Sequence, residues 1–184
     1  MDGLTKAARV LAVAVLAQLV LLVASGVYLY FGYRPSSGAL AVDLLAPDVR
    51  RAVRIREVHV LETRLLLGSC LALLVLLVAR TPRTALDVVA GGWQLVMAAV
   101  ASFTGLLLPW DQLALRAVTV GTNIRGFTSI VAGDQIRFVL ISGSEVSTQA
   151  VVRWLIVHVV SAIALAVGPV TALVRMRRSR ATRP

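Results

Sequence analysis

Four stretches of the chain are each long and apolar enough to cross a lipid bilayer, and no other feature limits the fold as strongly. They cover roughly residues 9–31, 58–79, 86–108 and 150–174. A helical crossing needs about 20 mostly apolar residues. Hydrocarbon offers the backbone no partners for its polar groups, so each crossing must pair them internally. The sequence therefore predicts an all-α membrane protein, with residues 1–184 forming one domain built as a bundle of four transmembrane helices.

Composition supports a membrane location and excludes several kinds of site. Hydrophobic residues make up 58% of the chain, more than the roughly 45–50% of ordinary soluble domains. Cys70 is the only cysteine. A single cysteine excludes an intrachain disulfide, a haem attached through a CxxCH motif and an iron–sulfur cluster held by this chain alone.

The distribution of arginine predicts the orientation in the membrane. The first apolar run is too long for a signal peptide and no small-residue cleavage site follows it, so we expect it to remain as a helix. Three segments that four crossings place on one side are dense in basic residues with little acid, namely the N-terminus, the turn "RTPRT" and the tail "RMRRSRATRP". The two long connections on the other side also hold arginines, but these are diluted by Asp43, Asp48, Glu57, Asp111, Asp134 and Glu145. Because arginine and lysine favour the cytoplasmic side, we expect a multi-pass plasma-membrane protein with both termini in the cytoplasm. We expect the basic tail to contact anionic lipid and not nucleic acid.

Local signals predict where helices begin and end. Thr84 is placed to cap the third helix at its start, and Pro109 should end it. Between the third and fourth spans, "VTVGTNIRGF" and "AGDQIRFVLISG" are amphipathic pieces bounded by glycine and too short to cross. We expect them to form short interfacial helices on the outer face.

The two histidines of the chain lie at matching depths on two of the predicted spans. His59 is near the start of the second span, and His158 is about two turns into the fourth. These spans run in the same direction, from outside to inside, so both histidines lie toward the outer face. Two neutral imidazoles facing each other are what a six-coordinate haem iron requires. The alternative is that each histidine only forms a hydrogen bond with a neighbouring helix.

Glycines and arginines near these histidines are consistent with a haem site. Gly26 and Gly105 lie near the outer ends of the first and third spans, where glycine lets a flat group approach the backbone. Arg56 precedes His59 by one turn, and Arg153 precedes His158 by five residues. Arginine is a suitable partner for haem propionates. Helix packing by the glycines and interfacial anchoring by the arginines remain open as alternatives.

Several motifs in order along the chain resemble the N-terminal, haem-bearing half of cytochrome b. They are "YRPSSG", "IREVHV", "GLLLPWDQ" and "GSEVSTQAVVRWLIVH". The similarity is greatest to the split cytochrome b of chloroplasts and cyanobacteria. In that family the turn after the third helix begins the outer quinol site. The resemblance therefore implies that Pro109, Trp110, Asp111 and Gln112 belong to a quinone-site region covered by a surface helix.

The resemblance also implies that one of the family's two haems is missing here. Each haem-bearing helix of the family carries a second histidine, fourteen or fifteen residues after the first. In this chain Leu73 follows His59 at that spacing, and Ala172 and Leu173 follow His158. The inner haem would thus lack both axial ligands, and the expected cofactor is one haem b. We expect apolar side chains to fill the vacated space, with the second and fourth helices closer at residues 73 and 172 than at 59 and 158.

Further departures from the family occur around this inner position and elsewhere. Ala12 stands at the inner glycine position of the first helix and Leu76 at the position of the inner-haem arginine, although Gly91 remains on the third helix. Glu62 and Arg64 replace small residues after the first histidine. The family's C-terminal half, with its PEWY quinol-site motif, is absent from this sequence and would be another polypeptide.

These features predict an electron-transfer subunit of a membrane oxidoreductase, either non-catalytic or quinone-reactive. It would pass electrons between quinol or quinone and an extracytoplasmic redox partner. Expected partners are membrane lipid and other subunits of a redox complex, such as a Rieske protein, a PEWY-bearing subunit, a cytochrome, or a molybdenum or hydrogenase protein. The alternative is a structural membrane anchor with a redox-inert or minor haem. A transporter or channel is disfavoured because no charged residue lies in the middle third of the first, third or fourth span.

Overall fold

The fold is a bundle of helices long enough to cross a membrane. The computed structural model describes residues 3–32, 47–81, 83–109 and 148–181. Within these ranges every regular element is a helix: α1 (Gly3–Gly32), α2 (Pro47–Ala79), α3 (Ala85–Leu107), α7 (Thr148–Leu165) and α8 (Val167–Ala181). Four helical segments have the length and hydropathy of membrane spans, and α7 and α8 together make the fourth. The prediction of an all-α four-span protein is confirmed. The predicted interfacial helices between the third and fourth spans lie outside the described residues.

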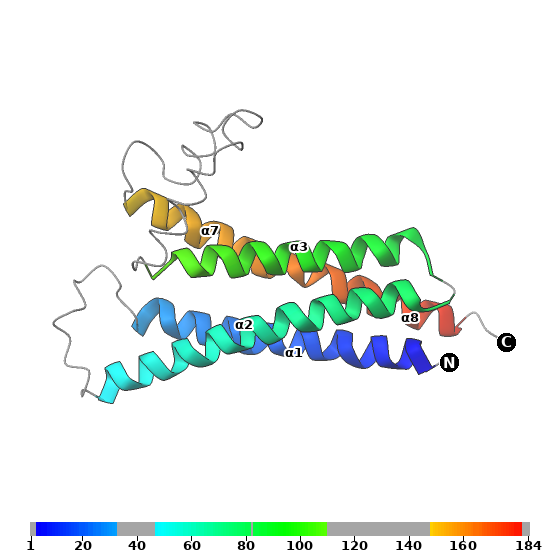
Figure 1. Cartoon of the computed structure of the whole chain (residues 1–184), viewed down its shortest axis with the longest axis horizontal. Helices are drawn as coiled ribbons and strands as arrows, with labels where there is room; N and C mark the ends of the chain where they lie inside the picture. Colours follow the sequence, from blue (N-terminus) through cyan, green and yellow to red (C-terminus); the bar gives the residue numbers. More distant parts are fainter. Residues whose placement is uncertain (1–2, 33–46, 82, 110–147, 182–184) are drawn as a thin grey trace, which may run out of the picture.

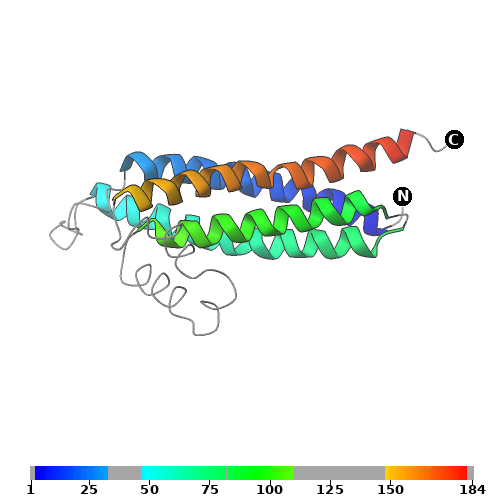
Figure 2. The same cartoon turned by 90° about the horizontal axis from the view of Figure 1, so that it is seen from above.

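The helices form a closed ring in which each span packs on two neighbours. α1 contacts α2, α2 contacts α3, and α3 contacts both α7 and α8, while α8 closes the ring by contacting α1. Figures 1 and 2 show the helices running along the long axis, with both chain termini at the same end as the turn between α2 and α3. We call this the terminal end of the bundle and the other the histidine end.

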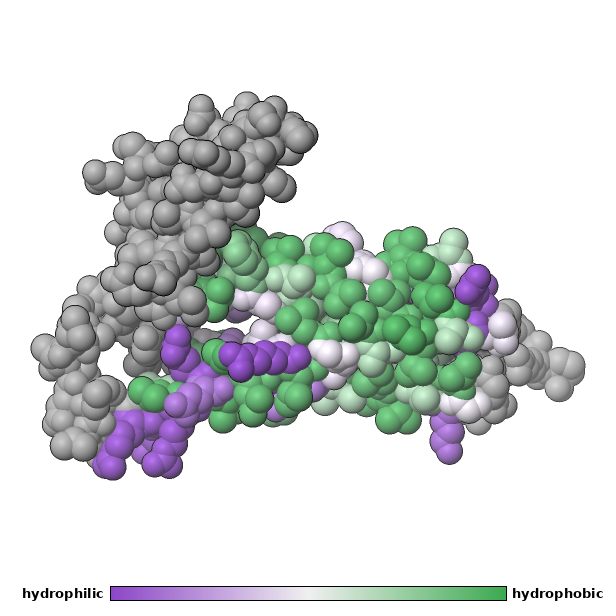
Figure 3. All heavy atoms as spheres, viewed as in Figure 1, coloured by the Kyte–Doolittle hydropathy of each residue, from purple (hydrophilic) through white to green (hydrophobic). Residues whose placement is uncertain are grey.

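The outer surface of the bundle is apolar, as a lipid-facing surface must be. Large hydrophobic side chains project outward along every span, including Val20 (67% exposed), Ile163 (65%) and Val10 (64%). In the space-filling view the middle of the molecule is almost uniformly hydrophobic (Figure 3). The interior is also apolar, with a cluster of buried residues contributed by all four spans. Because lipid is as apolar as this core, close packing must supply much of the attraction between the helices.

Both ends of α3 follow from local sequence signals. Thr84 has an extended backbone and caps the helix, and its side chain accepts a hydrogen bond from the Asp87 amide. The Asp87 carboxylate in turn accepts one from the Thr84 amide at 2.9 Å, which completes a capping box. At the other end α3 stops at Leu107, two residues before Pro109. The predictions for Thr84 and Pro109 are confirmed.

A buried ionic cluster joins the terminal ends of three helices. Asp87 is 1% exposed, and its Oδ1 is 2.7 Å from Nη2 of Arg80 and 3.2 Å from Nε of Arg175. Arg175 also donates to the Thr84 hydroxyl at 2.8 Å. Removing one partner from a buried pair leaves an uncompensated charge, which is strongly destabilising. The carboxylate thereby ties the turn between α2 and α3 to α8.

The fourth span is divided at Ala166 and is not one continuous helix over 150–174. Pro169 lacks the amide hydrogen that would bind the carbonyl one turn earlier, which disrupts a helix at this point. The Ala166 amide donates to the carbonyl of Ile163, three residues back, at 3.1 Å. An α-helix would use the carbonyl four residues back. The indole Nε1 of Trp93 donates to the carbonyl of Ala164 at 2.8 Å. A side chain of α3 therefore supplies a hydrogen bond beside the break.

Gly168 brings α8 against α3 directly after this break. A Cβ atom at Gly168 would lie 2.6 Å from the carbonyl oxygen of Ala90 and 2.7 Å from Cβ of Gln94. Real Cβ atoms do not approach backbone so closely, so a side chain here would push the helices apart. The close contact closes the ring toward the terminal end, where α8 also reaches α1.

We expect the substitution Gly168→Ala to destabilise the bundle by about 1–3 kcal/mol, the usual cost of overpacking. Gly92→Ala is the matched control, because a Cβ at Gly92 has no neighbour within 4 Å and alanine favours a helix. Thermal unfolding in detergent, followed by circular dichroism, measures both. Equal midpoints for the two variants would show that the contact at Gly168 does not hold the helices together.

Candidate functional site

The two histidines come together between opposite spans at the histidine end. His59 lies on α2 and His158 on α7, and both rings are half-buried. Their ring centres are 6.3 Å apart, and the ring planes are inclined by 50°. Residues 99 positions apart in the sequence thus form one pair of potential ligands. Among the described residues no group of three or more His, Cys, Asp or Glu side chains converges, so this pair is the arrangement to examine.

Ser25 holds the His59 ring in place through its Nδ1 atom. Its hydroxyl donates its only proton to a backbone carbonyl of α1, at 2.9 Å from Leu21 or 3.1 Å from Leu22. The same oxygen is 2.8 Å from Nδ1 of His59. In the tautomer that carries its hydrogen on Nδ1, His59 donates to this hydroxyl, which donates in turn to α1. Nε2 of a neutral His59 is then left with a free lone pair.

A backbone carbonyl fixes the His158 ring in the same way. Nδ1 of His158 is 2.8 Å from the carbonyl oxygen of Ala101 on α3. A carbonyl only accepts, so Nδ1–H must donate. Metal-binding histidines commonly hold one ring nitrogen in such a hydrogen bond, which orients the ring and leaves the other nitrogen for the metal. Both imidazoles are therefore prepared to bind iron through Nε2.

The separation of the two rings suits one metal ion between them. An imidazole nitrogen binds a metal at about 2 Å, and the ring centre lies about 1 Å behind that nitrogen, so two axial rings have centres about 6 Å apart. The observed distance is 6.3 Å. Two axial nitrogens and no other protein ligand are the donor set of a bis-histidine haem. The residues present fit a b-type haem.

Glycines lie against both imidazoles, whereas the close approach of a haem to these glycines stays a prediction. A Cβ at Gly105 would be 2.9 Å from Cε1 of His158, which is too close. A Cβ at Gly26 would be 3.5 Å from Cε1 of His59, an ordinary contact. Gly26 and Gly105 therefore belong to the site, although only Gly105 is required sterically by the described residues.

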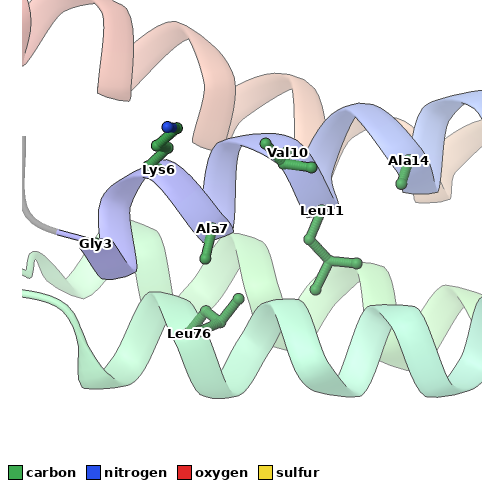
Figure 4. A pocket seen from close by; sticks show the side chains of 7 residues that line it. All are labelled: Gly3, Lys6, Ala7, Val10, Leu11, Ala14 and Leu76. Carbon is green, nitrogen blue, oxygen red and sulfur yellow. The ribbon is translucent and has the colours of Figure 1, made fainter.

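The surface of the bundle is hollowed in two places. Figure 3 shows an opening between α2 and α3 at the histidine end. A separate groove lies near the terminal end, between α1 and α2, where Ala7, Leu11 and Leu76 point toward one another (Figure 4). Apart from Lys6, the residues that line this groove are apolar or glycine, and none is a metal ligand. This groove therefore offers no ligands for a metal cofactor, in contrast to the pair of histidines.

Comparison with known proteins identifies the family of this chain. The family model described as cytochrome b/b6/petB matches residues 5–180. The chain belongs to the cytochrome b family. Cytochrome b6 of Heliobacterium modesticaldum is 30% identical over 155 residues, which covers 78% of this chain and 70% of that protein. Cytochrome b6 of Heliomicrobium gestii is 29% identical over 154 residues, covering 78% and 69%.

Membership of the cytochrome b family establishes the general role. Proteins of this family bind b-type haem and carry electrons within membranes as part of multi-subunit complexes. The chain is accordingly a multi-pass membrane protein and an electron-transfer subunit of cytochrome b type. The number of haems and the roles of single residues depend on the structure of this particular chain.

The level at which the cytochrome b family holds its inner haem is packed with apolar side chains here. Leu73 on α2, Ala172 on α8 and Ala12 on α1 are all fully buried in the same cluster, and Leu76 and Leu173 pack against it. A Cβ at Gly91 would be 2.8 Å from Cδ1 of Leu74 and 3.3 Å from its Cα. The inner glycine of α3 therefore faces a leucine of α2. That α2 and α8 are closer at this level than at the histidines stays a prediction.

The remaining residues singled out from the sequence are placed only in part. Arg56 is half-buried on α2, one turn before His59, and Arg153 is exposed on α7. Their contact with haem propionates stays a prediction. Pro109 follows the end of α3 at the histidine end. Trp110, Asp111 and Gln112 lie outside the described residues, so their role at a quinone site also stays a prediction.

Polar residues that hold the site and the core were missed in the sequence. Ser25 was not singled out, although it directly precedes Gly26 and so lies at the depth of His59. Gln94 is fully buried and donates from Nε2 to the carbonyl of Cys70 at 3.2 Å. A glutamine within an apolar span indicates a contact with another helix, because its amide needs a hydrogen-bonding partner in hydrocarbon. It could have indicated a contact between α3 and α2.

We expect the substitution Gly105→Ala to impair haem binding, because the new methyl group would displace the His158 ring from its hydrogen bond with Ala101. Reduced-minus-oxidised spectra of purified protein should show less low-spin haem per chain. Gly68→Ala on α2 is the control, since a Cβ there has no neighbour within 4 Å. A normal spectrum and haem content for Gly105→Ala would show that the His158 position tolerates movement.

Proposed function

We propose that this cytochrome b chain carries one haem, held by His59 and His158 near the outer face of the plasma membrane. It exchanges electrons between quinol or quinone and an extracytoplasmic redox partner. The observation that carries this proposal is the pair of imidazoles 6.3 Å apart, each with Nδ1 engaged and Nε2 left for a metal. No other histidine exists in the chain.

The protein's own residues hold and orient the cofactor. His59 and His158 would supply the ligand nitrogens, Ser25 and the Ala101 carbonyl orient their rings, and Gly105 leaves room for the His158 ring. Arg56 and Arg153 supply positive charge for the propionates. A haem bound there supplies one-electron chemistry at its iron, with a potential set by axial ligands, nearby charge and burial.

Electron transfer is confined to the outer half of the membrane in this proposal. Leu73 and Ala172, at the family's inner ligand positions, are fully buried among apolar side chains. Fourteen residues of helix correspond to about 21 Å along the axis, so no second haem bridges the distance to the inner face. The chain then serves a reaction at one face and does not support a transmembrane quinone cycle.

The proposed orientation rests on the charges at the terminal end of the bundle. Arg80, Arg83, Arg175 and Arg177 lie there with the N-terminal Lys6. The positive-inside rule assigns this end to the cytoplasm. The histidines then face outward, and Pro109–Gln112 lies at the outer surface as a quinone-site region. A Rieske protein, a PEWY-bearing subunit, a cytochrome, or a molybdenum or hydrogenase protein would be suitable companions.

We expect at most one haem b per chain, since only two imidazoles exist. A pyridine haemochrome assay on the purified protein measures this ratio. Either His59→Ala or His158→Ala should abolish the low-spin spectrum, whereas Cys70→Ala should leave it unchanged. A content of two haems per chain would refute the one-haem proposal. A haem that is present but stays oxidised with a quinol analogue would favour the alternative role, a structural anchor.

We expect Arg56→Leu and Arg153→Leu each to lower the midpoint potential of the haem, because positive charge near the iron stabilises its reduced form. The shift should be on the order of tens of millivolts, where about 59 mV is a tenfold change for one electron. Redox titration of the purified protein measures it, with Arg83→Leu, an exposed residue at the terminal end, as control. Unchanged potentials in both variants would assign Arg56 and Arg153 to membrane anchoring.

A further inference from the structure

Helix α2 is longer than a membrane crossing requires, and its extra turns lie at the histidine end. The helix contains 33 residues. At this length it spans about 50 Å, whereas the hydrocarbon core of a bilayer is only about 30 Å thick. The sequence predicted the span from residue 58, but the helix begins at Pro47, and proline suits the first helical position. About three turns before His59 therefore project from the apolar part of the bundle.

These projecting turns carry a cluster of exposed arginines. Arg50, Arg51 and Arg54 are all exposed, and none forms an ion pair with another described side chain. Arg50 and Arg54 lie on one face, being four residues apart. Ala52, between them in the sequence, is 6% exposed. Figure 3 shows hydrophilic side chains gathered over the start of α2, in contrast to the apolar middle. We call Arg50, Arg51 and Arg54 the arginine patch.

The arginine patch lies close to the candidate haem ligand along the helix. Arg54 precedes His59 by five positions and Arg50 by nine. The helical rise converts these spacings to about 7.5 Å and about 13.5 Å along the axis. The arginines of the patch have no described acidic partner, whereas at the terminal end Asp87 pairs with Arg80 and Arg175. Arginine is disfavoured in short outer segments of membrane proteins. A cluster on the outer side therefore calls for a function other than orientation.

We propose that the arginine patch is the docking surface for an acidic, water-soluble one-electron carrier protein. The proposal rests on the proposed function, because it assigns the extracytoplasmic partner of the haem. Complementary charge steers two proteins together and can raise the association rate about 10- to 1,000-fold, with a strong dependence on ionic strength. A carrier that binds the patch lies within two to three helical turns of His59.

Electron transfer to matched carriers of opposite charge tests the proposal. Native cytochrome c is basic, and succinylation of its lysines makes the same protein acidic. Stopped-flow mixing with the full-length, reduced haem protein in phosphatidylcholine nanodiscs gives the rate constant for each. We expect the acidic form to react faster and to slow as salt increases. In R50E/R54E the acidic form should slow about tenfold and the basic form should accelerate.

The control reverses charge at the opposite end of the bundle. R83E/R177E alters exposed arginines at the terminal end and should leave both rates unchanged. If charge is the cause, R50Q/R54Q should react with the acidic carrier at a rate between those of the wild-type protein and R50E/R54E. The same variant replaces R50E/R54E in the test if R50E/R54E does not fold. An acidic-carrier rate that is the same in wild-type and R50E/R54E protein, with normal haem spectra, would overturn the proposal.

Binding without electron transfer separates this proposal from the haem assignment. Calorimetric titration with succinylated cytochrome c should detect binding to wild-type protein and to H158A, and lose it in R50E/R54E. A chain that binds no haem but retains this pattern supports docking while the haem assignment fails. If R50E/R54E retains carrier binding and instead loses copurifying phosphatidylglycerol, the patch binds anionic lipid and the docking proposal is wrong.

Discussion

In hydrocarbon every backbone polar group must be paired, and this requirement governs the fold. The regular pairing is interrupted where the fourth span breaks. Pro169 interrupts the helical hydrogen bonds, and Trp93 of α3 donates to the carbonyl of Ala164 beside the break. Gly168 then allows α8 to approach the backbone of Ala90 on α3. These contacts close the bundle toward the terminal end and leave the histidine end more open. The asymmetry of the bundle thus begins with one proline–glycine pair.

Glycine serves two different purposes at the two ends of this asymmetric bundle. At Gly105 the missing side chain leaves room for the His158 ring, whose Nδ1 is held by a backbone carbonyl. At Gly91 and Gly168 it lets one helix pack directly on another. The same residue type therefore prepares a cofactor site at one level and fills the space at another. This difference is consistent with a cytochrome b chain that has kept its outer haem site alone.

The net charge of +10 is divided among environments with different physical consequences. Arg80 is buried and paired with Asp87, so it holds helices together. Arg50 and Arg54 are exposed on projecting turns of α2, where charge acts on molecules that approach from water. Exposed charge contributes little to stability, so these arginines are available for recognition.

The sequence by itself determined the four spans, the cap at Thr84, the end of α3 before Pro109 and the matching depth of His59 and His158. These features are local, because they depend on segment length, hydropathy and spacing along one helix. Only the tertiary structure decided which atoms meet between helices, including Ser25 with His59, Ala101 with His158, and Asp87 with Arg80 and Arg175. A span that is apolar on all sides, such as α1, has no pattern that specifies which face turns inward. Its rotation and depth are set by packing against its neighbours, and the contacts of the site follow from that packing.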